Sequence, residues 1–273
     1  MTSPLTVLAL GWDRAILEIK VYFREKDQVF FSFLFPVLML ALFATVFQTQ
    51  FEGPDNEAIG LSAARFFLPG MMAAGVLLTS FQTMALTVAT ERDDGTLKRL
   101  RATPMPALAY FLGKVGLVLV TSVLQSALLL LMARVLFDVQ LPTEARQWVT
   151  LGWVFGLGVV SGTVLGIAYS SLATSARSAG AAVIGPVLVL QFISGVYFSF
   201  EDIPQWLKEV ASLFPLKWIA QGMRSVFYPD SFASREMAGV WEHGRIALVL
   251  VAWAIGGLVL CTTTFRWFKR GST

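Results

Sequence analysis

A cluster of charged residues between two long apolar runs is the part of this sequence best suited to chemistry with a partner. Residues 91–104 read ERDDGTLKRLRATP and hold three acidic and four basic side chains. Residues 66–90 and 115–133, on either side, contain no Asp, Glu, Lys or Arg. Each run is long enough for a helix that crosses a bilayer, which needs about 20 residues. The cluster is therefore predicted to be a short loop on the cytoplasmic side, where loops are rich in Lys and Arg.

The order of residues within this loop indicates a short helix. Asp93 comes just before a stretch that can be helical, where a carboxylate favours the positive end of the helix dipole. Gly95 permits a sharp entry, and Pro104 ends the turn. Leu97 and Leu100 are three residues apart and share one helix face. Two interpretations stay open, a solvated loop or a docking site for a cytosolic partner.

Uncharged polar side chains inside the apolar runs are the second group that could act on a substrate. A transport pathway needs hydrogen-bonding groups that face it, but polar side chains in membrane helices also join neighbouring helices. Both roles stay open for these residues. They are Thr79, Gln82, Thr83, Gln125, Ser126 and Gln191.

Patterns for catalysis and for nucleotide binding are missing from the sequence. Neither Gly-x-x-x-x-Gly-Lys-(Ser/Thr) nor His-Glu-x-x-His occurs. One cysteine, Cys261, and one histidine, His243, cannot form a disulfide framework or a multi-histidine metal site. Lys114 and Arg134 lie near the ends of a predicted span, whereas ion-coupled transporters more often place a charge within one. We expect no catalytic and no metal site, so that powered transport would need energy from another chain.

Composition places the chain among integral membrane proteins. Of its 273 residues, 56% are hydrophobic and 14% are charged, whereas soluble domains have about 25% charged residues. The formal net charge of +3 gives no indication of a nucleic-acid partner. An all-α membrane fold is predicted, with six transmembrane helices in a single domain over residues 1–273.

Hydrophobic periodicity assigns the elements of this fold. Residues 5–26 have an apolar stripe opposite a charged face, which is typical of a helix in the membrane interface, although an ordinary packed helix stays open. Lys and Arg number twelve in the segments placed inside and seven in those placed outside, which favours both termini inside. The predicted spans are residues 29–51, 66–90, 107–137, 147–176, 178–200 and 246–265.

Residues 201–243, ahead of the last span, are irregular. Pro204 can open a helix through Trp206, and Pro215 interrupts it before an amphipathic stripe that begins at Leu216. Each piece is too short to cross a bilayer, so the pair could dip into the outer leaflet and return, or lie upon it. We predict an external re-entrant helical hairpin between spans five and six.

The pattern Glu-Arg-(Asp/Glu)-x-Gly-Thr-Leu-x-x-Leu-x-x-Thr-Pro after the second span resembles the cytoplasmic loop of ABC-transporter permeases of the type-2 exporter class, which includes the daunorubicin-resistance permeases. Asp93 stands where many relatives carry Glu. In that family the loop forms a coupling helix seated on the ATPase. The resemblance therefore implies ATPase contact for Glu91, Arg92, Asp93, Gly95, Thr96, Leu97, Leu100, Thr103 and Pro104.

The hairpin carries a second resemblance to the same family. Pro215-Leu216 followed by Arg224 is similar to the family's signature ahead of its last span. In relatives this hairpin lines the external end of the translocation path. The residues implied there are Pro204, Trp206, Pro215, Leu216 and Arg224.

The resemblance implies a permease subunit of an ATP-driven exporter, multi-pass in the bacterial inner membrane with both termini cytoplasmic. The implied partners are two cytosolic ATPase subunits, which would hold ATP and Mg²⁺, a second permease, identical or homologous, and membrane lipid. No cofactor is expected in this chain. The expected substrate is an amphipathic drug or lipid-like molecule. Alternatives are export of a lipid-linked polysaccharide, or a non-transporting membrane scaffold or enzyme.

Overall fold

The computed structural model describes residues 3–54, 56, 59–173 and 175–265, and the regular structure of these residues is helical throughout. Six stretches are long and apolar enough to cross a membrane, which confirms the predicted fold class. The basic residues Arg266, Lys269 and Arg270, expected at the inner membrane border, lie outside the described residues. The six stretches are Lys26–Val46, Ala63–Asp93, Ala107–Phe137, Ala145–Leu172, Ala176–Ile193 and His243–Thr264.

The spans are formed by the following helices: α2 (Lys26–Val46), α5 (Ala63–Leu77) with the π-helix η1 (Leu78–Gln82) and α6 (Thr83–Asp93), α8 (Ala107–Phe137), α9 (Ala145–Tyr169) with the 3₁₀ turn η2 (Ser170–Leu172), α10 (Ala176–Ile193) and α13 (His243–Thr264). The remaining elements are α1 (Pro4–Arg24), α3 (Gln48–Phe51), α7 (Thr96–Arg101), η3 (Phe200–Asp202), α11 (Gln205–Ser212), α12 (Pro215–Phe227) and η4 (Asp230–Arg235).

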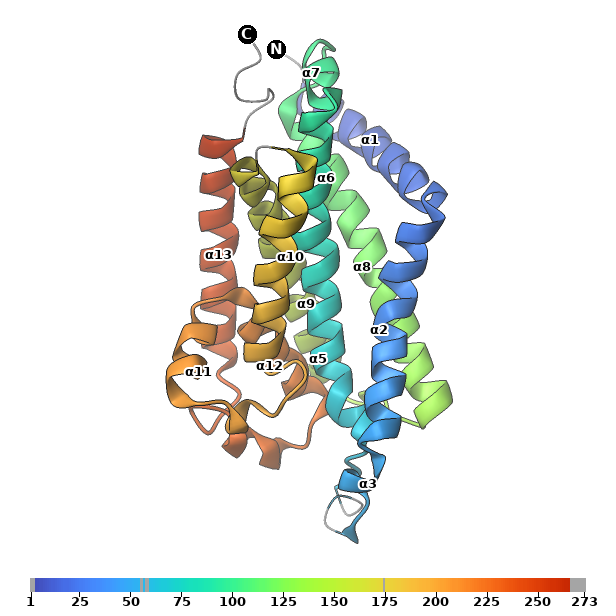
Figure 1. Cartoon of the computed structure of the whole chain (residues 1–273), viewed down its shortest axis with the longest axis vertical. Coiled ribbons are helices and arrows are strands. Elements are labelled where there is room, and N and C mark those ends of the chain that lie inside the picture. Colours follow the sequence, from blue (N-terminus) through green and yellow to red (C-terminus); the bar gives the residue numbers. More distant parts are fainter. Residues whose placement is uncertain (1–2, 55, 57–58, 174, 266–273) are drawn as a thin grey trace.

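The second span, formed by α5, η1 and α6, occupies the centre of the bundle (Figure 1). In the most apolar part of this span 67% of the residues are buried, against 22% in α2 and in α13. The helices α2, α8, α9, α10 and α12 all pack against it. Two glycines of α9 allow the close approach on one side: a Cβ added at Gly162 would lie 2.0 Å from Ser80 Oγ, and one at Gly166 would lie 2.4 Å from Phe81 O. Any movement of this span would therefore reach most of the fold.

Figure 1 shows α1, α7 and the C-terminal end of α13 at one end of the molecule, with α3, α11 and α12 toward the other. The helix α1 packs on α8 through a narrow face that includes Gly11, Ala15 and Glu18. Its apolar stripe points away from the chain, and Trp12 is 70% exposed. At its C-terminal end the stripe meets α2, where the Phe23 and Phe33 rings lie 6.1 Å apart, while the exposed Leu8, Trp12 and Ile16 are suited to face lipid.

The first, fourth and fifth spans end earlier than hydropathy predicts, the first at Val46 and not at residue 51. The helix of the fifth span ends at Ile193 and not at Phe200, because Gly195 adopts a left-handed conformation with φ of +73°. The apolar residues after it pack on the second span, where the Val196 carbonyl lies against Gly70. The fourth span ends at Leu172 and not at 176. Hydropathy extends the spans because it cannot distinguish an apolar loop from an apolar helix.

The hairpin α11–α12 runs into the bundle alongside α9 and α13. Gln147 Nε2, at the start of α9, donates to the Val226 carbonyl (3.2 Å), and Gly158, eleven residues further on, contacts Ile219. Between these contacts, from Ile219 to Val226, α12 rises about 10 Å alongside α9 at 1.5 Å per residue. Trp253 Nε1 donates to the carbonyl of Leu213 (3.0 Å). The tip of the hairpin thus lies level with the middle of α13.

Candidate functional site

The segment 91–104 is a helix–turn–helix at the end of the second span. The helix α6 continues to Asp93, so the first charged residues of the motif are helical. Gly95 then turns the chain with φ of +78°, and Asp94 Oδ1 accepts the backbone N–H of Thr96 (2.8 Å). Only glycine takes this conformation without strain, which explains Gly-Thr at the start of α7. The predicted short helix is present as α7.

The leucines of α7 turn toward the chain itself. Leu97 is fully buried and Leu100 is half-buried. The leucine pair thus packs α7 against its own bundle, and the contact of Leu97 and Leu100 with the ATPase stays a prediction. The exposed residues of the segment are Asp94, Lys98, Arg99, Arg101, Ala102, Thr103 and Pro104.

Glu91 joins three helices through a buried ionic network. Its Oε1 lies 2.5 Å from Lys114 Nζ on α8, and its Oε2 accepts a hydrogen bond from Tyr110 OH (2.7 Å). Lys114 Nζ also lies 2.9 Å from Glu18 Oε1 on α1, and Arg14 Nη2 lies 2.5 Å from the same oxygen. The two cations and two carboxylates balance in formal charge, which is the condition for burying them.

Close helix packing brings these charges together. A Cβ at Gly113 would lie 2.4 Å from Arg14 Cγ, and one at Gly116 would lie 2.7 Å from Ala15 Cβ, so α1 approaches α8 at two glycines. Sequence reasoning missed the network because it placed Lys114 merely near a span end. A lysine at the head of a charge-free run was the available signal, since such a cation needs a partner when buried.

Arg92 and Asp93 hold the neighbouring helix ends. Arg92 Nη1 donates to the Ser170 carbonyl (2.7 Å), and Arg92 Nη2 lies 3.0 Å from Ser170 Oγ. The Ala176 N–H, at the start of α10, donates to Asp93 Oδ2 (3.1 Å), where a carboxylate also favours the helix dipole. Glu91, Arg92 and Asp93 therefore fasten α6 to α1, α8, η2 and α10. The predicted contact residues divide into an inner set that makes these ties and an outer set on α7.

A polar cavity of about 210 Å³ lies within the spans, between α2, η1 and α8. It brings together four of the six predicted pathway residues. Ser126 does not line it, and Gln191 lies elsewhere, where its Oε1 accepts from Tyr197 OH (2.5 Å). Sequence reasoning missed the wall that α2 provides, with Ser32 between two phenylalanines. The lining residues are Phe31, Ser32, Phe35, Pro36, Leu78, Thr79, Gln82, Thr83 and Gln125.

The π-helix η1 places these polar groups. Its wider turn is held by side-chain hydroxyls, since Thr83 Oγ1 donates to the Leu78 carbonyl (2.9 Å) and Thr79 Oγ1 to the Gly75 carbonyl (2.9 Å). Thr79 Oγ1 also lies 2.6 Å from Ser122 Oγ on α8. Single π turns occur frequently at functional sites. The hydroxyls thus serve as helix–helix contacts, while the amides of Gln82 and Gln125 remain at the cavity wall.

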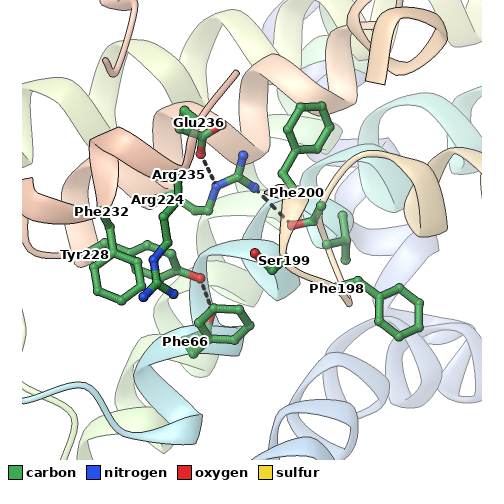
Figure 2. A pocket seen from close by; sticks show the side chains of 11 residues that line it. Phe66, Phe198, Ser199, Phe200, Arg224, Tyr228, Phe232, Arg235 and Glu236 are labelled. Carbon is green, nitrogen blue, oxygen red and sulfur yellow. Dashed lines mark hydrogen bonds and ion pairs between the residues drawn. The ribbon is translucent and has the colours of Figure 1, made fainter. Parts of the chain in front are cut away.

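Arg224 of the hairpin is buried and not exposed at the surface. Its Nε donates to Glu236 Oε1 (2.6 Å) and its Nη1 to the Gly195 carbonyl (3.0 Å), as Figure 2 shows. Tyr228 OH donates to the Phe66 carbonyl (2.6 Å) beside it. The cavity between these residues is about 20 Å³, the size for one water molecule. Arg224 therefore ties the hairpin to the segment after α10, and its place at the external end of a pathway stays a prediction.

The other predicted hairpin residues have separate roles. Pro204 precedes α11, Pro215 begins α12, and Leu216 is fully buried, so these three shape and anchor the hairpin. Trp206 is 66% exposed and remains available for a contact. Lys217 is buried beside Trp218, and burial lowers its pKa to about 8, although nearby carboxylates oppose the shift.

Comparison with known proteins places this geometry among membrane transporters. Residues 13–228 match the family described as "ABC-2 type transporter". The chain is 23% identical over 187 residues to the probable multidrug ABC transporter permease YbhR of Escherichia coli (strain K12). That match covers 68% of this chain and 49% of YbhR, so the chain spans about half the length of this relative.

Two further relatives match more of their own length. The putative transport permease YvfS of Bacillus subtilis (strain 168) is 24% identical over 204 residues, which cover 74% of this chain and 79% of YvfS. The inner membrane transport permease YadH of Escherichia coli (strain K12) is 20% identical over 221 residues, which cover 81% of this chain and 85% of YadH.

Proposed function

The chain belongs to the ABC-2 type transporter family, and from this premise we propose that it is the permease of an ATP-driven exporter. The family and the six apolar helices show that the chain is a transmembrane transporter subunit with several spans. Energy would come from two cytosolic ATPase subunits that hold ATP and Mg²⁺. A second permease, identical or homologous, would complete the pathway.

The contact with the ATPase is proposed to lie on the exposed face of α7 and the turn after it. This face includes Lys98, Arg99 and Pro104. The observation that carries the proposal is the division of the motif: Glu91, Arg92 and Asp93 fasten the end of α6 to four other elements, whereas Lys98, Arg99 and Pro104 are exposed at the surface beyond it. A push on α7 would therefore be transmitted directly to the spans.

The substrate is proposed to pass the polar cavity between α2, η1 and α8. Two phenylalanines and two amides line it, a mixture that suits an amphipathic molecule with a hydrogen-bonding group. YbhR is named a probable multidrug permease, which agrees with an amphipathic drug as substrate. Transport would end beside the hairpin, where Trp206 is exposed.

The membrane orientation follows from the same proposal. With α7 in the cytoplasm, α1 and the end of α13 lie at the inner face and the hairpin enters from outside. The tip of the hairpin lies about 15 Å from the outer end of α13, ten residues at 1.5 Å each, so the hairpin would be re-entrant. YadH is named an inner membrane permease, which supports the bacterial inner membrane as the location.

Affinity purification from native membranes in a mild detergent tests this function. We expect mass spectrometry to identify a co-purifying chain with a Gly-x-x-x-x-Gly-Lys-(Ser/Thr) loop, because an exporter permease needs that subunit. Lys98→Glu on α7 should lower its recovery at least fivefold. Arg146→Glu, a charge reversal at an exposed position at the start of α9, should leave recovery unchanged. Recovery of the permease without such a chain, or equal recovery with both variants, would contradict the proposal.

A further inference from the structure

A second cavity, of about 330 Å³, forms a groove between α10 and α13 on the opposite side of the second span. It is within the size range of ligand sites, roughly 300–1,000 Å³. Its walls are almost entirely apolar and come from η1, α9, α10, α12 and α13. Phe81, Tyr169, Pro186, Phe214, Trp253 and Leu260 supply much of the surface.

The few polar atoms of the lining already have partners. Tyr169 OH donates to the Ala182 carbonyl (3.0 Å), and Trp253 Nε1 donates to the Leu213 carbonyl (3.0 Å). The hydroxyl of Thr264 donates to the Leu260 carbonyl (2.6 Å). A ligand that needs hydrogen bonds would lose those it makes with water and gain few here. The groove therefore selects a hydrocarbon.

The length of the groove matches one leaflet of a bilayer. Phe214 and Trp253 close one end at the middle of the bundle, and Leu172 and Thr264 mark the other end. The eleven residues from Trp253 to Thr264 rise about 16 Å at 1.5 Å each. Half of the ~30 Å hydrocarbon core is about 15 Å. A single acyl chain that extends from the membrane border to the bilayer centre would fill this length.

The groove opens sideways to the surroundings of the spans. Leu260 is 47% exposed, Leu172 is 68% exposed, and Pro186 is exposed on the facing helix. The helix α10 packs on α6 and η1, while α13 packs on α9 and α12. The solvent at this depth of a membrane is lipid, so the opening faces acyl chains.

We propose that this groove binds one acyl chain of a phospholipid from the cytoplasmic leaflet. The leaflet rests on the orientation proposed above, whereas the binding of a chain does not. The site also touches the transport pathway, because Phe81 of η1 lines the groove while Thr79 and Gln82 of the same turn line the polar cavity. Lipid and substrate would contact opposite faces of one π turn.

Photo-crosslinking tests the proposal without any transport or ATPase readout. The permease is placed in nanodiscs that contain phosphatidylcholine with a diazirine near the middle of one acyl chain, and the crosslinked residues are mapped by mass spectrometry. We expect crosslinks to concentrate on the groove residues of α9, α10 and α13. Leu260→Trp, which fills the groove, should reduce them at least fivefold. Leu258→Trp, at an exposed position of α13 outside the groove, should leave them unchanged.

Two results would overturn the proposal. Equal crosslinking of the exposed faces of α2 and α8, without an effect of Leu260→Trp, would show annular lipid only. Protection of the groove from lipid, with disulfide crosslinking between two copies that carry cysteines at its rim, would show that a second permease covers it. Either result leaves the proposed export function standing, because that function is tested by the ATPase partner.

Discussion

Lys114 is the residue on which the end of the bundle beside α1 and α7 depends most. It is fully buried, and both Glu18 and Glu91 lie within 2.9 Å of its ammonium group. Removal of one partner from a buried ion pair leaves an unpaired charge and costs about 3–5 kcal/mol. Lys114 has two such partners on two other helices. Its loss would therefore weaken the attachment of α1 and of α6 together.

A substitution tests this dependence. Lys114→Met should lower the free energy of unfolding by about 3–5 kcal/mol, because two carboxylates lose their cation. Thermal unfolding in detergent measures the change. Arg134→Met is the matched control on the same helix, where the cation and Asp138 are exposed, and it should cost no more than about 1 kcal/mol. Equal losses in the two variants would show that the buried network does not stabilise the fold.

Leu97 shows how a residue in a docking motif can serve the fold. The three-residue spacing of Leu97 and Leu100 predicted one apolar face, which is present, but it could not say toward which side that face turns. A charge at position 97 would be buried in this chain, so a defect in such a variant would report on folding. Lys98, which is exposed on the same helix, is the position that reports on docking.

At the scale of elements, glycines decide where α9 packs. Gly152 and Gly156, and Gly158, Gly162 and Gly166, recur at four-residue spacings, which are typical of close contacts between membrane helices. Gly158, Gly162 and Gly166 do lie against other elements of the chain. Gly152 and Gly156 have nothing within 4 Å among the described residues, so the same spacing also occurs on an open face.

Two alanine substitutions distinguish the packed face of α9 from its open face. Gly162→Ala places a methyl group 2.0 Å from Ser80 Oγ, and this overpacking should destabilise the protein by about 1–3 kcal/mol. Gly156→Ala meets open space, and its better helix propensity should stabilise by up to about 1 kcal/mol. Melting temperatures should move in opposite directions. A shift of the same sign in both variants would contradict the packing of α9 on η1.

The sequence predicts the ends of a helix best where apolar residues give way abruptly to polar residues or proline. The third span, residues 107–137, matches α8 at both ends because Pro106 precedes it and Asp138 follows it. The fifth span does not match, since the loop after Gly195 is as apolar as the helix before it. Contacts between distant segments, such as Glu18 with Lys114, depend on helix packing that no local pattern contains.

At the scale of the whole molecule, the candidate pathway and the candidate ATPase contact share one helical rod. The second span carries η1 and the polar cavity in its middle, and α7 follows its last residue, Asp93, after the turn at Gly95. Four of the six pathway residues inferred from sequence meet in that cavity because η1 and α8 face each other there. Glu91 lies between the two sites and fastens the rod to α1 and α8, so we expect it to transmit movement rather than to bind substrate.

Coupling in a reconstituted complex tests this account most directly. The permease and its ATPase are placed in proteoliposomes with daunorubicin as the probe for the proposed drug-like substrate. The amount transported per ATP hydrolysed is measured, with thermal stability recorded alongside. Glu91→Gln should retain ATP hydrolysis but lower this ratio at least fivefold, while Glu52→Gln at the opposite end should leave it unchanged. An unchanged ratio for Glu91→Gln would contradict the central claim that this segment couples ATP hydrolysis to transport.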